Sequence, residues 1–162
     1  MKKNNFTSNL YLTNWFFLLL AIASLIFIVS FLYAPLFFFA QLFLAFVVCY
    51  LLLDILIVYG SSTKLEAERE LKEQLNLGDN NLVKIYIQNH HNLPVILKVI
   101  DEIPYQFQIR DFSRFLTLNQ GESRTLDYYV KPVKRGAYRF GSLNVFVGSF
   151  LRIVQRRVQF SQ

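Results

Sequence analysis

The stretch WFFLLLAIASLIFIVSFLYAPLFFFAQLFLAFVVCYLLLDILIVY, Trp15 to Tyr59, decides the fold. Asp54 is its single charged side chain, and almost all other charged residues follow position 63. The chain of 162 residues is 54% hydrophobic with 17 Phe, which is more apolar than a soluble domain of this length usually is. The sequence therefore predicts a short N-terminal segment (1–14), a membrane block (15–59) and a soluble domain (64–162).

The membrane block is too long for one crossing. A single helix over residues 15–59 would be about 68 Å long, roughly twice the ~30 Å hydrocarbon core. A proline keeps its predecessor out of helical geometry and fits the first turn of a new helix, so Tyr33-Ala34-Pro35 marks the break. We expect helices at about 15–33 and 36–58 that form a transmembrane hairpin, with Thr13 or Asn14 capping the first.

Basic residues predict the orientation. Lys2 and Lys3 precede the first helix, Lys64 and Arg69 follow the second, and the connection between the helices carries no charge. Because basic residues favour the cytoplasmic side, both termini are expected there. A cleaved signal peptide is the competing interpretation, but no small-x-small cleavage site ends the first apolar run. Aromatic residues expected at the interfaces are Trp15, Tyr33 and Tyr59.

Asp54 is the intramembrane polar residue for which a role must be found. An acid at the bilayer centre costs about 3 kcal/mol. Asp54 lies five residues before Tyr59, so we place it only about 7 Å below the interface, within reach of water or of donors at Asn14 and Trp15. A structural or interfacial role is favoured. A proton relay and a contact between helices or subunits stay open, although neither helix holds a second acid, a His or a Lys.

The soluble domain has the alternation of strands. Val83, Ile85 and Ile87 alternate with polar residues and Tyr86, and clusters of Gly, Asn, Asp and Pro separate such runs. About seven strands in about 99 residues predict an all-β immunoglobulin-like sandwich. The first strand has a short helix as its alternative. The expected strands are 65–72, 82–89, 95–103, 113–118, 123–131, 136–147 and 151–160.

The segment KPVKRGAYRFGSLNVFV, Lys131 to Val147, is interpreted as a sandwich corner that turns at Gly136. Seven Lys and Arg and no acid lie between Tyr128 and Gln162, whereas residues 64–127 hold eight bases and ten acids. A solvated face, an anionic lipid surface and an acidic protein partner each explain this asymmetry. Nucleic acid is disfavoured because no recognition motif accompanies the charge. The candidate contact residues are Lys131, Lys134, Arg135 and Arg139.

The sequence predicts no enzyme and no cofactor. It contains no nucleotide-binding loop, no nucleophile elbow and no cysteine pair, since Cys49 is the single cysteine. His90 and His91 lie among turn formers and are expected to be solvated rather than metal ligands. The acids Asp101 and Glu102 are interpreted as a solvated turn edge.

Five segments together resemble the N-terminal part of the bacterial domain-of-unknown-function family fifty-eight. The resemblance implies a two-helix membrane hairpin in the inner membrane, a cytoplasmic β-sandwich, and a following von Willebrand factor A-like domain, often encoded beside MoxR-type AAA+ ATPases. It spans the whole chain but only the first part of such a protein. The segments are Tyr11-Leu12-Thr13-Asn14, Leu51-Leu52-Leu53-Asp54, Glu66-Ala67-Glu68-Arg69-Glu70-Leu71, Asp101-Glu102-Ile103-Pro104 and Pro132-Val133-Lys134-Arg135-Gly136-Ala137-Tyr138.

The chain departs from that family in two places. Where members carry Ser-Pro-x-Gly-Leu between the last two strands, this chain has Ser149-Phe150-Leu151-Arg152-Ile153, which leaves the last turn uncertain. The sequence also stops where the von Willebrand-like domain would begin, so no metal-adhesion motif carries over, and a truncated member is expected.

These observations predict a membrane-anchored, non-enzymatic scaffold or adaptor for a protein partner. The resemblance implies that this partner is a MoxR-type ATPase. An anionic-lipid-binding module and a membrane enzyme or ion-coupled carrier that uses Asp54 are the alternatives.

Overall fold

The computed structural model describes residues 9–60, 65–72, 74–109 and 112–160. The chain divides into two compact units: Met1–Ser62 with Gly148–Arg156, and Thr63–Val147 with Arg157–Gln162. The basic residues Lys2, Lys3 and Lys64, on which much of the predicted orientation depends, lie outside the described residues.

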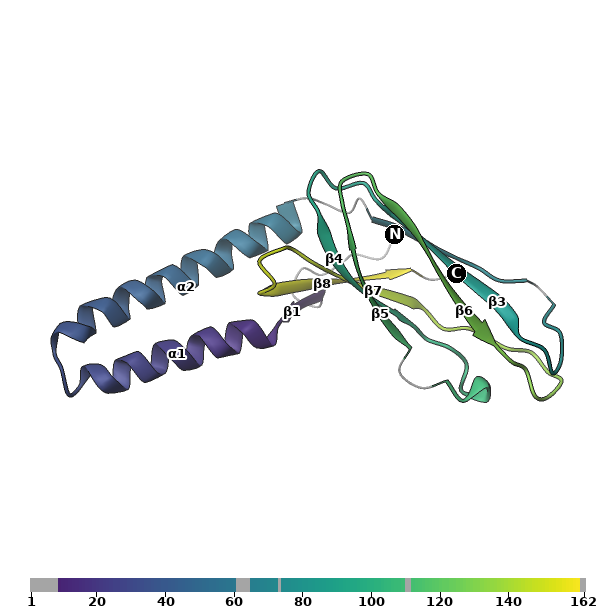
Figure 1. Cartoon of the computed structure of the whole chain (residues 1–162), viewed down its shortest axis with the longest axis horizontal. Helices are drawn as coiled ribbons and strands as arrows, with labels where there is room; N and C mark the ends of the chain where they lie inside the picture. The colour runs from purple at the N-terminus through teal and green to yellow at the C-terminus, as the bar shows by residue number, and fades with distance from the viewer. Residues whose placement is uncertain (1–8, 61–64, 73, 110–111, 161–162) are drawn as a thin grey trace. The chain divides into compact units, whose positions relative to one another are not determined.

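Within the described residues, two α-helices and eight strands follow one another (Figure 1). Their order is β1 (Leu10–Leu12), α1 (Asn14–Ser30), α2 (Pro35–Gly60), β2 (Leu65–Glu70), β3 (Asn81–Asn89), β4 (Val95–Asp101), the 3-10 turn η2 (Tyr105–Phe107), β5 (Ser113–Leu118), β6 (Ser123–Val130), β7 (Leu143–Gly148) and β8 (Val154–Phe160).

The helices of the first unit break where the proline predicts. Pro35 begins α2, and backbone hydrogen bonds from Leu32 to Val29 and from Leu36 to Tyr33 close the turn between the helices. The ring centroids of Phe27 and Phe37 lie 6.0 Å apart, and the helices run antiparallel (Figure 1). The break is therefore confirmed, although α1 ends at Ser30 rather than at residue 33.

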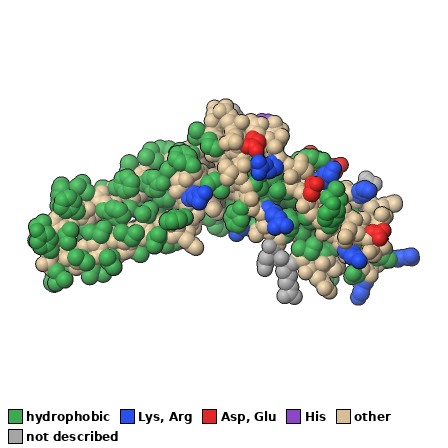
Figure 2. Space-filling model, viewed as in Figure 1, with side chains coloured by type: hydrophobic (Ala, Val, Ile, Leu, Met, Phe, Trp, Pro, Cys, Tyr) green, Lys and Arg blue, Asp and Glu red, His purple; other side chains and the backbone are tan. Residues whose placement is uncertain are grey.

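Large apolar side chains cover both helices. Phe37, Phe38 and Phe39 are all exposed, whereas the buried residues Ala40, Val47 and Asp54 recur every seven positions and so form one narrow stripe along α2. Figure 2 shows hydrophobic side chains over the visible face of both helices. Within the described residues, α2 is the helix long and apolar enough to cross a membrane, whereas α1, with 17 residues, is a shorter apolar helix.

The second unit contains two sheets, in which β2–β3, β3–β6 and β4–β5 pair antiparallel. One has the order β2-β3-β6, and the other has the order β8-β7-β4-β5. Ile85 is opposite Arg69 on β2 and Leu126 on β6, and Leu97 on β4 is opposite Leu116 on β5. Strands β2 to β6 match their predicted positions to within two residues at each end, and the segment from residue 65 is a strand rather than a helix.

The two sheets share one hydrophobic core. Val83, Ile85 and Ile87 from β3 are buried, as the alternation of β3 predicts, and they cluster with Leu97 and Val99 from β4. Because residues of both sheets form one cluster, the unit is a β-sandwich.

The sixth predicted strand is wrong in its first half. Strand β7 begins at Leu143, whereas residues 136–142 form no strand. Tyr138 stacks on Phe107 with ring centroids 4.6 Å apart, and the ring of Phe140 lies 5.8 Å from the same side chain. This aromatic cluster holds the segment in place of a sheet ladder.

Strand β1 is absent from the sequence-based prediction. In the first unit Leu10 is opposite Arg156, and Leu12 is opposite Val154 at the start of β8. Three residues are too short to show alternation, so the pairing with a segment far along the chain could not be predicted from local sequence.

Candidate functional site

The four predicted contact residues all lie on the β6–β7 connection of the second unit. Lys131, Lys134, Arg135 and Arg139 are exposed. The connection is fixed at its base: the Tyr138 hydroxyl donates to the Lys134 carbonyl (2.5 Å), and the Gly78 N–H donates to the Pro132 carbonyl (2.9 Å). The four basic residues predicted from the sequence therefore lie on one surface loop, which these two hydrogen bonds stabilise.

A cleft of about 550 Å³ opens beside this loop, and only two of the four basic residues line it. Lys134 and Arg135 join Lys72 on its rim, while Lys131 and Arg139 lie outside the lining. A lining that combines apolar and cationic side chains suits a segment that combines acidic and apolar side chains. The apolar lining residues are Leu71, Leu75, Leu77, Pro132 and Ala137.

Asp54 lies in a different place, wholly within the first unit. Its side chain is fully buried, and its partners come from the segment between β7 and β8. One carboxylate oxygen accepts from the Ser149 hydroxyl, and the other accepts from the backbone N–H groups of Ile153 (2.8 Å) and Val154 (2.7 Å). Asn14 and Trp15, the donors that the sequence offered, are not the ones that Asp54 uses.

This arrangement gives Asp54 a structural task. Three donors on two oxygens compensate the buried charge, because hydrogen bonds to a carboxylate offset its desolvation. In the part of the chain that the structure describes, no group of three His, Cys, Asp or Glu is placed to hold a metal ion. The favoured structural interpretation of Asp54 therefore has a specific geometric basis.

Two hydrogen bonds close the Ser149–Ile153 turn, whose residues include neither proline nor glycine. The Ser149 hydroxyl oxygen accepts from the Leu151 N–H (2.9 Å), and the Arg152 N–H donates to the Ser149 carbonyl (3.3 Å). Arg152 has φ 60°, in the left-handed region that costs an L-residue about 1–2 kcal/mol. It stands where the family pattern has glycine.

The Thr13 hydroxyl also contacts this turn. It donates toward the Arg152 and Ile153 carbonyls, and the Thr13 N–H donates to the Ile153 carbonyl (2.9 Å). Thr13 occupies the N-cap position of α1 without a side-chain cap hydrogen bond, so the predicted capping by its side chain is wrong.

A buried ion pair connects the two sheets of the second unit, and sequence reasoning missed it. Arg69 on β2 donates to Asp101 on β4 (2.6 Å), and their side chains are 5% and 0% exposed. The Tyr128 hydroxyl on β6 donates to the other Asp101 oxygen (2.5 Å). Burial, and then the hydrogen bond to Asp101, raise the pKa of Tyr128 far above its usual range, so the phenol stays a donor.

The interpretation of Asp101 and Glu102 as a solvated turn edge is therefore wrong for Asp101. Asp101, the last residue of β4, is buried, whereas Glu102 is exposed. Glu102 accepts from the Asn144 side chain (2.7 Å) and from the Ser142 N–H (3.0 Å), while Arg157 donates to Asn144 (2.7 Å).

Gly141 gives a direct test of the Glu102 packing. A Cβ at Gly141 would lie 2.5 Å from the Glu102 Oε2 and 2.6 Å from its Cβ, so Gly141→Ala forces Glu102 to move. We expect a loss of about 1–3 kcal/mol in unfolding free energy. Chemical unfolding of the full chain in detergent, followed by near-ultraviolet circular dichroism, measures it.

Gly60→Ala is the matched control, because nothing lies within 4 Å of a Cβ at Gly60. It should leave stability unchanged or slightly higher. Equal losses from both variants would contradict steric exclusion at Gly141.

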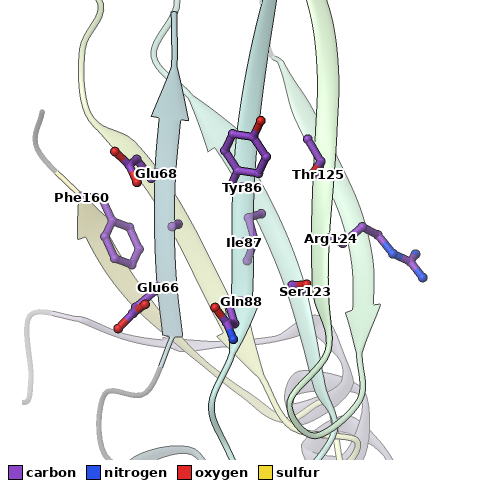
Figure 3. Close-up of a pocket in the computed structure, with 10 residues that line it drawn as sticks. Glu66, Glu68, Tyr86, Ile87, Gln88, Ser123, Arg124, Thr125 and Phe160 are labelled. Carbon is purple, nitrogen blue, oxygen red and sulfur yellow. The ribbon is translucent and has the colours of Figure 1, made fainter.

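A second groove, of about 680 Å³, crosses the outer face of the β2-β3-β6 sheet (Figure 3). Its carboxylates are already engaged in part: Glu66 lies 3.3 Å from the His90 Nε2, and neighbouring Glu70 accepts from the Tyr86 hydroxyl (2.8 Å). The residues that line it include Glu66, Glu68, Tyr86, Gln88, Ser123, Thr125 and Phe160.

The two histidines differ in exposure. The His90 side chain is partly exposed, whereas His91 is buried. The backbone N–H of His91 donates to the Asn89 side-chain oxygen (3.0 Å). The expectation of solvation is therefore wrong for His91, because buried Asn89 ties this turn to the Leu118 and Asn119 carbonyls.

Comparisons with known proteins assign no family. No family model matches the chain, and no curated protein matches it. The ASH/PapD-like domain 7 of human CEP192 aligns with 62% of this chain and 82% of its own, at 13% identity and a TM-score of 0.45. The β-glucosidase from Listeria innocua aligns over 62% of this chain and 16% of its own, at 17% identity and a TM-score of 0.32. The β-glucuronidase 2 of Bacteroides uniformis aligns over 59% and 12%, at 9% identity and a TM-score of 0.32. Similarity at this level transfers no activity to the chain.

Proposed function

We propose that this protein is a membrane-anchored scaffold. Helices α1 and α2 cross the bacterial inner membrane as a hairpin, and the second unit, an immunoglobulin-like sandwich, binds a protein partner at the cytoplasmic face. The observation that carries this proposal is the exposure of large apolar side chains around both helices.

The helices have the properties of lipid-facing segments. The α2 helix is about 39 Å long, enough to cross a ~30 Å core with some tilt, and α1 at about 26 Å is near the lower limit. Small side chains, Ala23 and Ala40, are buried between neighbouring elements while the large ones point outward. This distribution is typical of helices that pack in lipid, because small residues allow close approach.

The basic cleft supports docking of a partner. Lys134 and Arg135 lie on a loop that hydrogen bonds fix, beside apolar lining residues, so a partner does not have to order the loop when it binds. Acidic residues on the partner would pair with this rim, and apolar ones would fill the cleft. The family resemblance names a candidate, a MoxR-type AAA+ ATPase.

Reversing the charge of the rim tests the proposal. The full chain, purified in mild detergent, is expected to retain a MoxR-type ATPase from the same cell. The double variant Lys134→Glu/Arg135→Glu should lose most of that binding, because each reversed pair replaces attraction by repulsion. Surface plasmon resonance at two salt concentrations measures the change in affinity.

Arg124→Glu is the matched control, since Arg124 lines the other groove and pairs with Glu122 at 3.0 Å. It should bind like the unmodified chain. Binding that survives deletion of residues 64–162 would refute docking by the sandwich.

A further inference from the structure

We infer that the turn Ser149–Ile153 is a third membrane-contacting element, which places Phe150 among acyl chains and Arg152 on the phosphate of an anionic phospholipid. This inference rests on the proposed insertion of α1 and α2. The turn, both helices and β1 belong to the same compact unit.

Hydrogen bonds fix the depth of the turn along the helices. Thr13, directly before α1, pairs with Ile153, while the Tyr50 hydroxyl lies 3.5 Å from the Leu151 carbonyl. Tyr50 is ten residues before the end of α2 at Gly60, about 15 Å along the helix axis. The turn therefore lies beside the apolar surface of α2, at the level where α1 begins.

The side chains of the turn match an interface. Phe150 is 58% exposed, and Trp15, two residues after Thr13, is 57% exposed. One exposed aromatic residue alone is ordinary on a protein surface. At the end of an apolar helix, however, aromatic side chains settle at the boundary between acyl chains and headgroups.

Arg152 supplies the charge. Its left-handed backbone is unfavourable for most residues other than glycine, asparagine and aspartate, and strained residues cluster at functional sites. Asp54, the one acid of the first unit, already accepts three hydrogen bonds. Arg156, whose guanidinium lies 5.1 Å from the Tyr59 ring centroid, adds a second positive charge to this unit. An exposed guanidinium at this depth suits a phosphate oxygen.

Quenching by brominated lipids tests the position of the turn. Trp15 is the single tryptophan, so Trp15→Phe/Phe150→Trp gives one reporter in the full chain reconstituted in phosphatidylcholine vesicles. Its emission should be quenched by 6,7-dibromo lipids more than by 11,12-dibromo lipids, because the turn enters only the outer part of the acyl region. A spin label on Phe150→Cys in a Cys49→Ala background gives an independent depth.

The variant Trp15→Phe/Phe38→Trp separates the two hypotheses. Phe38 is exposed within α2, close to its first residue Pro35, so it should also be quenched, and more by the 6,7-dibromo lipids. If Phe38→Trp is quenched and Phe150→Trp is not, the turn inference fails and the anchor stands. If neither is quenched, the membrane proposal fails as well.

Headgroup preference tests Arg152. Brominated phosphatidylglycerol should be enriched about fivefold over phosphatidylcholine around the residue-150 reporter, the effect of one basic residue near the surface. Arg152→Gln should abolish the preference, and Arg124→Gln, which removes an exposed charge of the second unit, should leave it intact. An unchanged preference in Arg152→Gln overturns the assignment. A preference that is lost in inorganic phosphate, but not in chloride of equal ionic strength, would indicate a soluble phosphate ligand in place of a lipid headgroup. That result would also overturn the assignment.

Discussion

We expect Asp101→Asn to lower the unfolding free energy of the second unit by about 3–5 kcal/mol, the usual cost of breaking a buried ion pair. The change keeps the size of the side chain but leaves the Arg69 guanidinium without a counter-charge in a site where its side chain is 5% exposed. It also places an amide where Tyr128 now donates to a carboxylate at 2.5 Å. Urea unfolding of the full chain in detergent, followed by tyrosine near-ultraviolet circular dichroism, measures the loss.

Two further variants distinguish the contribution of the buried ion pair from that of charged side chains in general. Arg69→Met/Asp101→Leu should recover part of the loss, because apolar residues remove both charges and not only one. Glu122→Gln breaks an exposed pair, Arg124 with Glu122, and should cost below about 1 kcal/mol. A loss in Asp101→Asn no greater than that in Glu122→Gln would show that the buried pair does not stabilise the sandwich.

The strands that could be predicted are those in which buried and outward residues alternate along the strand's own sequence. In β3, Val83, Ile85 and Ile87 alternate with outward residues, and a sheet with one buried face requires that period. Strand β7 was placed too early because Tyr138 and Phe140 continue the same alternation, yet they pack around Phe107. Alternation reports that a side chain is buried and does not report which partner buries it.

The site was predictable only in part, for the same reason. Charge composition located the loop that carries Lys134 and Arg135, because an excess of one sign is visible in the sequence itself. The partners of Asp101 and Asp54 lie 27 or more positions away along the chain, and no local pattern indicates them. The one available signal was Asp54, an acid in an otherwise uncharged apolar run, because a buried acid requires hydrogen-bond donors.

The buried Asp54 carboxylate and the β7–β8 turn stabilise each other through hydrogen bonds. The turn has neither the proline nor the glycine of the resembled family, and Arg152 adopts a conformation that disfavours it. The Asp54 carboxylate binds both ends of the turn, Ser149 and the Ile153–Val154 backbone, and so compensates for a locally unfavourable sequence. If the helices insert as proposed, burying the acid costs free energy, and its three hydrogen bonds offset that cost.

Replacing Asp54 by Leu should therefore open the turn without harming membrane insertion. Leu enters a bilayer more favourably than Asp by about 3 kcal/mol, so any loss must come from the hydrogen bonds. The Ser149 hydroxyl and two backbone N–H groups lose their acceptor, and unsatisfied buried donors cost about 1–3 kcal/mol each. Hydrogen exchange at the Ile153 and Val154 amides, measured in nanodiscs, should accelerate more than about a hundredfold for a 3 kcal/mol loss.

Asp54→Asn distinguishes this structural role from a proton relay. The amide keeps an oxygen for the Ile153 and Val154 N–H groups, so exchange should rise far less than in Asp54→Leu, and any cellular function should persist. Tyr50→Phe, which removes only the 3.5 Å contact with the Leu151 carbonyl, is the matched control and should barely change exchange. A chain whose turn stays protected in Asp54→Asn while its cellular function disappears would favour the relay, because only proton transfer requires the ionisable group itself.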